Sequence, residues 1–231
     1  ELRNAGAETL FKIVIRNMDS SSLTAESSSG NIQISSNGSQ VDVKSASGNI
    51  ALPSSGSMVI SNTTVVSTSG DISLESTGGS LQMGVASTGG SVRLHAATEI
   101  GGSNGAAVDV VASALTAEAP NSITLDTAVS GANLSGPAGA PTTGNITLNN
   151  SGSLTLGTVN ASGDVRVTTS TGVITLGRVV SDGATTLTAI GSGGGIADDG
   201  NGQTVSLMTG GAATLTTSGT IGTVNDPLSV N

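Results

Sequence analysis

The chain has 231 residues, 34 of them Gly, and it contains no Cys, Trp or Tyr and a single Phe. Seven Lys and Arg residues oppose sixteen Asp and Glu residues, so the formal net charge is −9, and the charges are scattered. An acidic chain with a single Phe lacks the cationic groove and stacking platforms that nucleic acids require, so we expect no nucleic-acid partner. No run of about 20 apolar residues occurs, and we expect no membrane insertion by this segment.

The N-terminal segment departs from the pattern of the rest. It holds three of the seven basic residues, Arg3, Lys12 and Arg16. We expect residues 1–28 to form irregular N-terminal coils or a junction to a preceding module. Their short apolar run is interrupted by Lys12, unlike a secretory signal peptide, so an export signal would lie elsewhere.

From Ser29 onward one phrase recurs: a small polar residue, Gly, then Asn or Asp, then apolar residues alternating with polar ones. Gly beside Asn or Asp is typical of a turn, and strict alternation is typical of a half-buried strand. Each phrase therefore predicts a turn followed by a short strand. The phrase occurs at residues 29–34, 47–52, 69–74, 143–148 and 162–167.

The spacing of the phrases predicts the architecture. The steps from Gly48 to Gly70 and from Gly70 to Gly90 are of nearly equal length. Each step is a coil of about 20 residues, and a coil of that length with two or three short strands is the unit of a parallel β-helix. We therefore predict an all-β parallel β-helix, or solenoid, over residues 29–231. Disorder is the alternative for a Gly- and Ser-rich chain, but disordered chains do not keep this alternation.

One stretch within the repeats is rich in Gly and Pro. Residues 131–143 contain three Gly and two Pro, a composition that does not favour a strand. We expect a loop excursion from the rod over 131–143. Loops on a rigid scaffold are common places for recognition.

The densest acidic spot comes later, at residues 198–202. Calcium takes about six to eight oxygen ligands, and two carboxylates, one amide and free carbonyls can supply several of them. The loop matches neither an EF-hand nor a nonapeptide calcium repeat, and a plain Asp–Gly turn is the simpler interpretation. We therefore treat calcium as the one cofactor to consider, with Asp198, Asp199 and Asn201 as its candidate ligands.

Signs of catalysis are weak. His95 is the only histidine, so any Ser–His–Asp triad would depend on it. Asp71, Glu75, Glu99 and Asp109 fall on roughly neighbouring coils, as in carbohydrate-active β-helix enzymes, but the aromatic and basic side chains that line sugar grooves are scarce. We predict no catalytic residue. Thr pairs raise the idea of an ice-binding face, but no Thr-x-Thr array on successive coils can be aligned from the sequence.

The repeat grammar resembles a known family. The Ser-Gly-Asn-Ile phrases, the repeated coil length, and residues 195–200 and 219–223 followed by Pro227 and Leu228 are similar to the repeats of filamentous-haemagglutinin-type adhesins. Those are giant secreted bacterial proteins, often exported by a two-partner route. The resemblance covers nearly all of the chain from about Ser29 and implies a right-handed parallel β-helix at the bacterial cell surface.

The resemblance implies a non-enzymatic structural and adhesive module that acts as a rod or stalk. Its expected partners are host or microbial surface glycans or proteins, or neighbouring copies of the chain. Two alternatives stay open: a self-assembling extracellular matrix or sheath fibre, and a carbohydrate-active enzyme. Head-to-tail growth would favour the fibre, and a carboxylate cluster in a deep groove would favour the enzyme.

Overall fold

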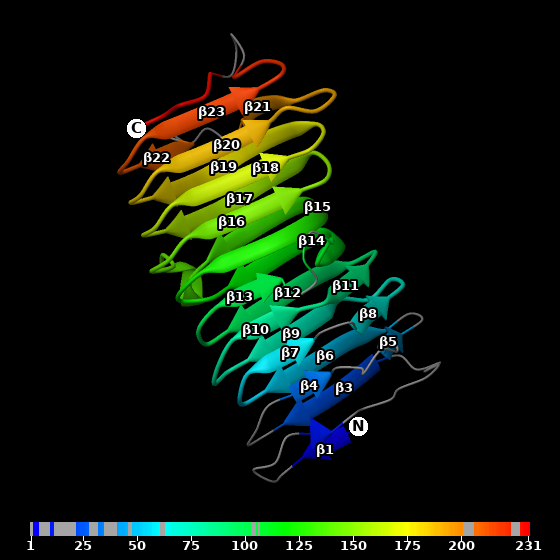
Figure 1. Cartoon of the computed structure of the whole chain (residues 1–231). Coiled ribbons are helices and arrows are strands. Elements are labelled where there is room, and N and C mark those ends of the chain that lie inside the picture. Colours follow the sequence, from blue (N-terminus) through cyan, green and yellow to red (C-terminus); the bar gives the residue numbers. More distant parts are fainter. Residues whose placement is uncertain are drawn as a thin grey trace.

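The structure is a computed structural model. It describes residues 2–4, 10–11, 22–27, 32–34, 41–45, 48–60, 63–102, 105, 107–200, 206–222 and 227–231. These residues form 23 strands and one short 3-10 helix, η1 (Pro137–Gly139), stacked in a single column (Figure 1). None of the described residues belongs to a helix with the length and apolarity that a membrane span requires.

Every pairing between the described strands is parallel, and the strands stack into three ladders. The first ladder has one short strand in each coil. It runs through β2 (Leu10–Phe11), β4 (Ile32–Ile34), β7 (Met58–Ile60), β10 (Leu81–Met83), β13 (Ile100–Gly102), the start of β15 (Ile123–Ser135), β16 (Ile146–Asn150), β18 (Val165–Thr169), β20 (Thr185–Ala189) and β23 (Ala213–Thr217).

The second ladder is confined to the N-terminal part, and the third runs the length of the stack. The second joins β5 (Val41–Ser45), β8 (Thr63–Ser67), β11 (Val85–Thr88), the start of β14 (Val110–Glu118) and the middle of β15. The third joins β1 (Leu2–Asn4), β3 (Ser22–Ser27), β6 (Asn49–Ser54), β9 (Ile72–Ser76), β12 (Ser91–Ala96), the ends of β14 and β15, β17 (Leu154–Ala161), β19 (Val173–Ser181), and β21 (Gly195–Asp198) and β22 (Leu207–Thr209).

The parallel β-helix predicted from the phrases is confirmed. The coils average roughly 22 residues, close to the predicted length. Individual coils differ, because the register joins Ala117 to Leu134 and then Leu134 to Val159, a much longer step along the chain. One column of the third ladder shows the stacking, through Leu52, Leu74, Leu94, Ala117, Leu134, Val159 and Val179.

The core is a set of aliphatic columns. Strands alternate between buried and outward-facing residues, as in β9 and β18. Full burial of each Leu, Ile or Val side chain stabilises the fold by about 2 kcal/mol, and like residues fill a narrow coil without aromatic rings. Two columns of the first ladder are Ile123, Ile146 and Val165, and Leu125, Leu148, Val167 and Leu187, each at most 1% exposed.

The Asn or Asp of the repeated phrase links one coil to the next. Oδ1 of Asn49 accepts a hydrogen bond from the N–H of Asp71 at 2.8 Å, and Oδ1 of Asp71 accepts one from the N–H of Ser91 at 2.8 Å. Asn145 and Asp164 repeat the arrangement in the C-terminal coils, both at 2.8 Å. Each side chain therefore supplies an acceptor to the turn of the following coil.

The glycine of the phrase lies in a bend, as predicted, and has a second role there. Gly70 and Gly163 are in bends but are not among the glycines with positive φ. A Cβ on Gly70 would lie 2.4 Å from the backbone C and O of Gly48. The position requires glycine because the backbones of successive coils touch there, leaving no space for a side chain.

In the N-terminal coils, buried hydroxyl groups just before these turns hydrogen-bond to backbone groups at the corner. Oγ of Ser67 accepts a hydrogen bond from the N–H of Gly70 at 2.9 Å and donates one to the carbonyl of Gly48 at 2.8 Å. Thr88 repeats the pattern with Gly90 and Gly70 in the next coil. Ser67 is 1% exposed and Thr88 is 7% exposed, so these buried hydroxyls have partners on two coils.

Two predicted segment boundaries can be compared with the strands. Within residues 1–28, β1 pairs with β3 and β3 pairs with β6, while most of the intervening residues lie outside the described part, so irregularity there stays a prediction. The excursion expected at 131–143 is narrower, because β15 continues through Ser135. Residues 136–141 leave the ladder around η1, and Thr142 bridges back to Ala161.

Candidate functional site

The predicted calcium loop follows β21. Oδ1 of Asp198 accepts a hydrogen bond from the N–H of Gly200 at 2.9 Å, and Oδ2 accepts one from the hydroxyl of Ser206. Gly200 has φ +68°, the left-handed conformation that closes such a turn. Both carboxylate oxygens of Asp198 thus hold the loop together, as the Asp–Gly turn interpretation expects.

The other two candidate ligands give no further support for calcium. The N–H of Asp199 donates to the carbonyl of Leu176 at 3.0 Å, and Asn201 lies outside the described residues. Within the described ranges no group of three His, Cys, Asp or Glu residues is arranged to hold a metal ion. Calcium binding by Asp198, Asp199 and Asn201 stays a prediction.

A charged column that the sequence analysis did not assemble lies on the outer side of the third ladder. Glu75, His95 and Glu118 occupy one register position on β9, β12 and β14. Nδ1 of His95 lies 3.7 Å from Oε1 of Glu75, and Nη2 of Arg93 donates to Oε2 of Glu118 at 2.7 Å. The register alone brings these side chains together, because each pair spans a whole coil of the chain.

This column lacks the parts of a nucleophilic triad. The next residue along it is Ser135, whose hydroxyl donates to the carbonyl of Gly136 at 2.9 Å and is buried. A catalytic serine needs its hydroxyl hydrogen-bonded to the histidine, and here that proton is directed to the backbone. Arg93, whose side chain is 59% exposed, forms an ion pair with Glu118, and the imidazole of His95 lies beside Glu75.

The four carboxylates weighed as an enzymatic cluster have separate environments. Asp71 caps the turn before β12, Glu75 lies beside His95, and Glu99 is exposed just before β13. Asp109 is buried at the start of β14, and Oδ2 accepts a hydrogen bond from the N–H of Asp126 at 2.8 Å. No hydrogen bond between any two of these four side chains is found in the described part of the chain.

A regular surface lies on the outer side of the first ladder in the C-terminal coils. Two side-chain columns run along it in register, and neighbouring coils are about 4.8 Å apart while alternate residues of a strand are about 6.6 Å apart. We call this surface the threonine face. It consists of Thr124, Asp126, Thr147, Asn149, Arg166, Thr168, Thr186, Thr188, Thr214 and Thr216.

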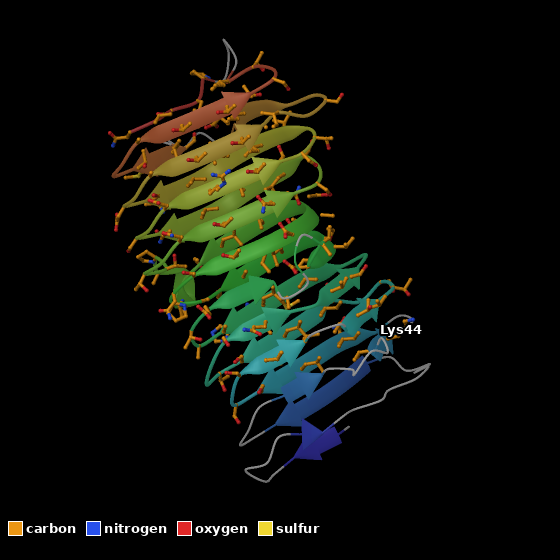
Figure 2. The ribbon with its side chains drawn as sticks, viewed as in Figure 1. Lys44 is labelled. Carbon is orange, nitrogen blue, oxygen red and sulfur yellow. The ribbon has the colours of Figure 1, made fainter. Side chains whose placement is uncertain are left out.

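The threonine face contains a Thr-x-Thr pair of coils that could not be aligned from the sequence. Thr186 pairs with Thr214 and Thr188 with Thr216, so two successive coils carry Thr-x-Thr in register. In the preceding coil Arg166 occupies the position of Thr186, and in the two coils before that Asn149 and Asp126 occupy the position of Thr188. None of the ten residues is buried, and Figure 2 shows side chains projecting outward along the stack, as Lys44 does on β5.

Comparison with protein-family models, with curated proteins and with solved structures finds no match to this chain. The geometry of the solenoid is therefore the basis for inferring its function.

Proposed function

We propose that this chain is a non-enzymatic structural and adhesive module of a large secreted bacterial cell-surface protein of the filamentous-haemagglutinin type. It works as a rigid rod whose outer surface makes weak, repeated contacts with glycans or proteins. The observation that carries the proposal is the threonine face, where hydroxyl, amide, carboxylate and guanidinium groups stand in register on five successive coils.

The rod part of the proposal is supported by the bonding between coils. The described coils are joined to one another by parallel backbone hydrogen bonds, by Asn and Asp side chains at the turns, and by buried hydroxyls at the corners. In a solenoid each coil contacts only its neighbours, and the same contacts repeat from coil to coil along the stack. A binding surface on this scaffold is held at fixed spacing.

The adhesive part is supported by the chemistry and the repeat of the face. Hydroxyl and amide groups exchange hydrogen bonds with sugar hydroxyls or with backbone groups, each worth about 1 kcal/mol. Such contacts are weak singly, but several contacts at fixed spacing raise the overall affinity through effective concentration. Arg166 has no ion pair among the described residues and adds a charged donor at the centre of the face.

The test is binding of the chain to an array of host and microbial glycans and matrix proteins, with calcium and again with chelator. We expect binding that is lost when Thr147, Thr186 and Thr214 are all replaced by Ala. The matched control is Thr155→Ala with Thr175→Ala, a pair in register on the outer side of β17 and β19. Equal binding by both variants, or a blank array, would remove the adhesive role and leave a spacer.

A second pair of variants separates charge from hydroxyl contacts. Arg166→Ala lies on the threonine face and Arg178→Ala lies on β19 of the same coil, and both side chains are exposed. We expect only Arg166→Ala to weaken binding to acidic glycans. Loss of binding on chelation, in the unsubstituted chain, would instead assign calcium to the loop at Asp198.

The fibre alternative stays a second candidate, because coils of this fold add to one another by parallel strand pairing, as β23 does to β20. A coil of another copy can be added in the same way. Growth of the sedimentation coefficient with concentration would support a self-assembling matrix or sheath fibre, and a concentration-independent monomer would exclude it.

A further inference from the structure

One buried carboxyl group lies where the coils change from three short strands to longer ones. Asp109 directly precedes β14 and is 1% exposed. Its N–H donates to the carbonyl of Asp126 at 2.7 Å, and its carbonyl accepts from the N–H of Ala86 at 2.8 Å. The backbone of Asp109 therefore joins β11 on one side to β15 on the other.

The side chain adds a second link to β15 and leaves one oxygen unused. Oδ2 accepts a hydrogen bond from the N–H of Asp126 at 2.8 Å, while Oδ1 is buried with no hydrogen-bond partner among the described residues. The backbone of Gly102 packs directly against this carboxyl, since a Cβ there would lie 2.4 Å from Oδ2. Ionisation of this carboxyl group is costly, because burial removes the water that would hydrate the charged form and no hydrogen-bond donor replaces it at Oδ1.

No cation in the described part of the chain compensates the charge. The elements packed against Asp109 are β11, β13 and β15, and their titratable groups are Asp126 on β15 and Glu99, which is exposed just before β13. Both are acids. At the far end of β14, Glu118 is already paired with Arg93.

We propose that Asp109 makes this junction a pH-sensitive joint, tight when the carboxyl group is protonated and loosened when it ionises. Protonation removes the uncompensated charge and leaves the links through Asp126 and Ala86 intact. Ionisation favours local opening of the backbone at Asp109, away from both β11 and β15, which lets water reach the carboxylate. The inference does not depend on what the threonine face binds.

The direction of the effect follows from the surroundings of the carboxyl group. Burial raises the pKa of Asp109 to about 6 from an ordinary 3.8, the Asp126 N–H lowers it, and the Asp126 carboxylate raises it. The opened state has the ordinary pKa, so the stabilisation is complete below about pH 4 and is lost as the pH rises through about 6. The population of the opened joint should be about tenfold larger near pH 7.5 than near pH 5.

Hydrogen exchange of single amides, converted to protection factors, tests the joint. The amides of Ala86, Asp109 and Asp126 should lose about tenfold in protection between about pH 5 and pH 7.5. Amides of β20 serve as the internal reference and should not change. Unchanged protection at the three joint amides, or an equal change in β20, would overturn the proposal.

Two variants test whether the pH dependence of protection comes from the carboxyl group of Asp109. Asp109→Asn keeps the size of the side chain and cannot ionise, so the pH dependence should vanish at the joint. The matched control is Asp71→Asn, because Asp71 accepts a backbone hydrogen bond of the same length, 2.8 Å, from a turn. A pH dependence that survives in Asp109→Asn, or disappears in Asp71→Asn, would contradict the proposal.

The competing explanation is that a cation, and not a proton, neutralises the carboxylate of Asp109. Repeating the hydrogen-exchange measurement near pH 7.5 with millimolar CaCl₂ and then with EDTA distinguishes the proton from the cation. We expect identical protection factors in both. Protection restored by CaCl₂ and removed by EDTA would replace the proton with a metal ion as the ligand of Asp109.

Discussion

The N-terminal and C-terminal coils differ in the number and length of the strands that make up one coil. Coils around β6, β7 and β8 use three short strands, with a buried hydroxyl such as that of Ser67 at the corner. Coils around β16 and β17 use one short strand and one long strand. In β17 the buried positions are Leu154, Leu156, Val159 and Ala161, so the alternation skips a residue at Gly157–Thr158.

The chain turns a corner of the coil at the interrupted alternation, Gly157–Thr158. The register of β17 on β15 shifts between Leu156 and Val159, and β19 repeats the skip at Gly177. A Cβ on Gly177 would lie 2.6 Å from the carbonyl oxygen of Gly157, so the bends are stacked with their backbones in contact. A bulge within one strand thus replaces the separate corner of the N-terminal coils.

Polar groups in the core differ as well. The N-terminal corner hydroxyls have partners on two coils. In the C-terminal coils Asn150 is fully hydrogen-bonded, but the buried hydroxyls of Thr169 and Thr185 have no partner among the described residues. We therefore predict that the glycines at which successive coils touch matter equally for stability in the N-terminal and C-terminal coils. Buried polar side chains should differ in their effect on stability, according to whether they have hydrogen-bond partners.

The largest effect should come from the glycine columns. Gly70→Ala places a Cβ 2.4 Å from the backbone of Gly48, and Gly163→Ala places one 2.6 Å from the carbonyl oxygen of Gly144, so each should lower the free energy of unfolding by about 3 kcal/mol. Gly101→Ala and Gly152→Ala are the matched controls, because nothing lies within 4 Å of their Cβ. Denaturant unfolding followed by circular dichroism measures all four, and controls as damaging as the column variants would refute the backbone-contact argument.

Asn150 should be next in magnitude. Its amide accepts from Thr127 and from the N–H of Val129, both at 2.9 Å, and donates to the carbonyls of Val129 and Gly152. Asn150→Ala leaves those buried groups unpaired and should cost about 3 kcal/mol. Asn149→Ala, on the outer side of the same strand, should cost less than about 1 kcal/mol in the same denaturant unfolding measurement, and equal losses would argue against this network.

The unpartnered threonines should change stability in the opposite direction. Thr185→Val replaces a buried hydroxyl without a partner among the described residues by a methyl group, so it should stabilise by about 1 kcal/mol. Thr127→Val removes a hydroxyl that donates to Asn150 and should destabilise by a similar amount. Melting temperatures of the two variants should shift in opposite directions, and a loss in Thr185→Val would reveal a bound partner for that hydroxyl.

The smallest effect is expected at the charged column. Arg93→Ala removes an exposed ion pair with Glu118 and should cost less than about 1 kcal/mol in unfolding free energy. The difference should shrink further at high salt, because exposed pairs are screened. A loss that salt does not reduce would mean that packing by the Arg93 stem, and not its charge, supports this coil.

Much of the fold was predictable because it depends on local signals. The alternation in phrases such as 69–74 identifies which side chains are buried, and the spacing of Gly48, Gly70 and Gly90 predicts the coil length. The parallel β-helix follows from these alone. The Asp198–Gly200 turn was also recognisable, since Asp and Gly at that spacing favour a turn.

The candidate site was less predictable because it depends on register. Thr186 and Thr214 are brought side by side, and so are Glu75, His95 and Glu118, in a stack whose coils differ in length. A single inserted residue moves a side chain to the other face. Even an accurate average coil length therefore cannot place two side chains next to each other.

The sequence by itself determined the class of fold, the aliphatic core and the positions of the turns, since each depends on residues a few positions apart. The tertiary structure alone decided that the turn glycines are required by contact between coils, that Asp109 is buried without a counter-charge among the described residues, and that the threonine face is in register. The physical reason is that backbone hydrogen bonds between coils set these relations, and their register reflects the lengths of all the turns and bulges between them.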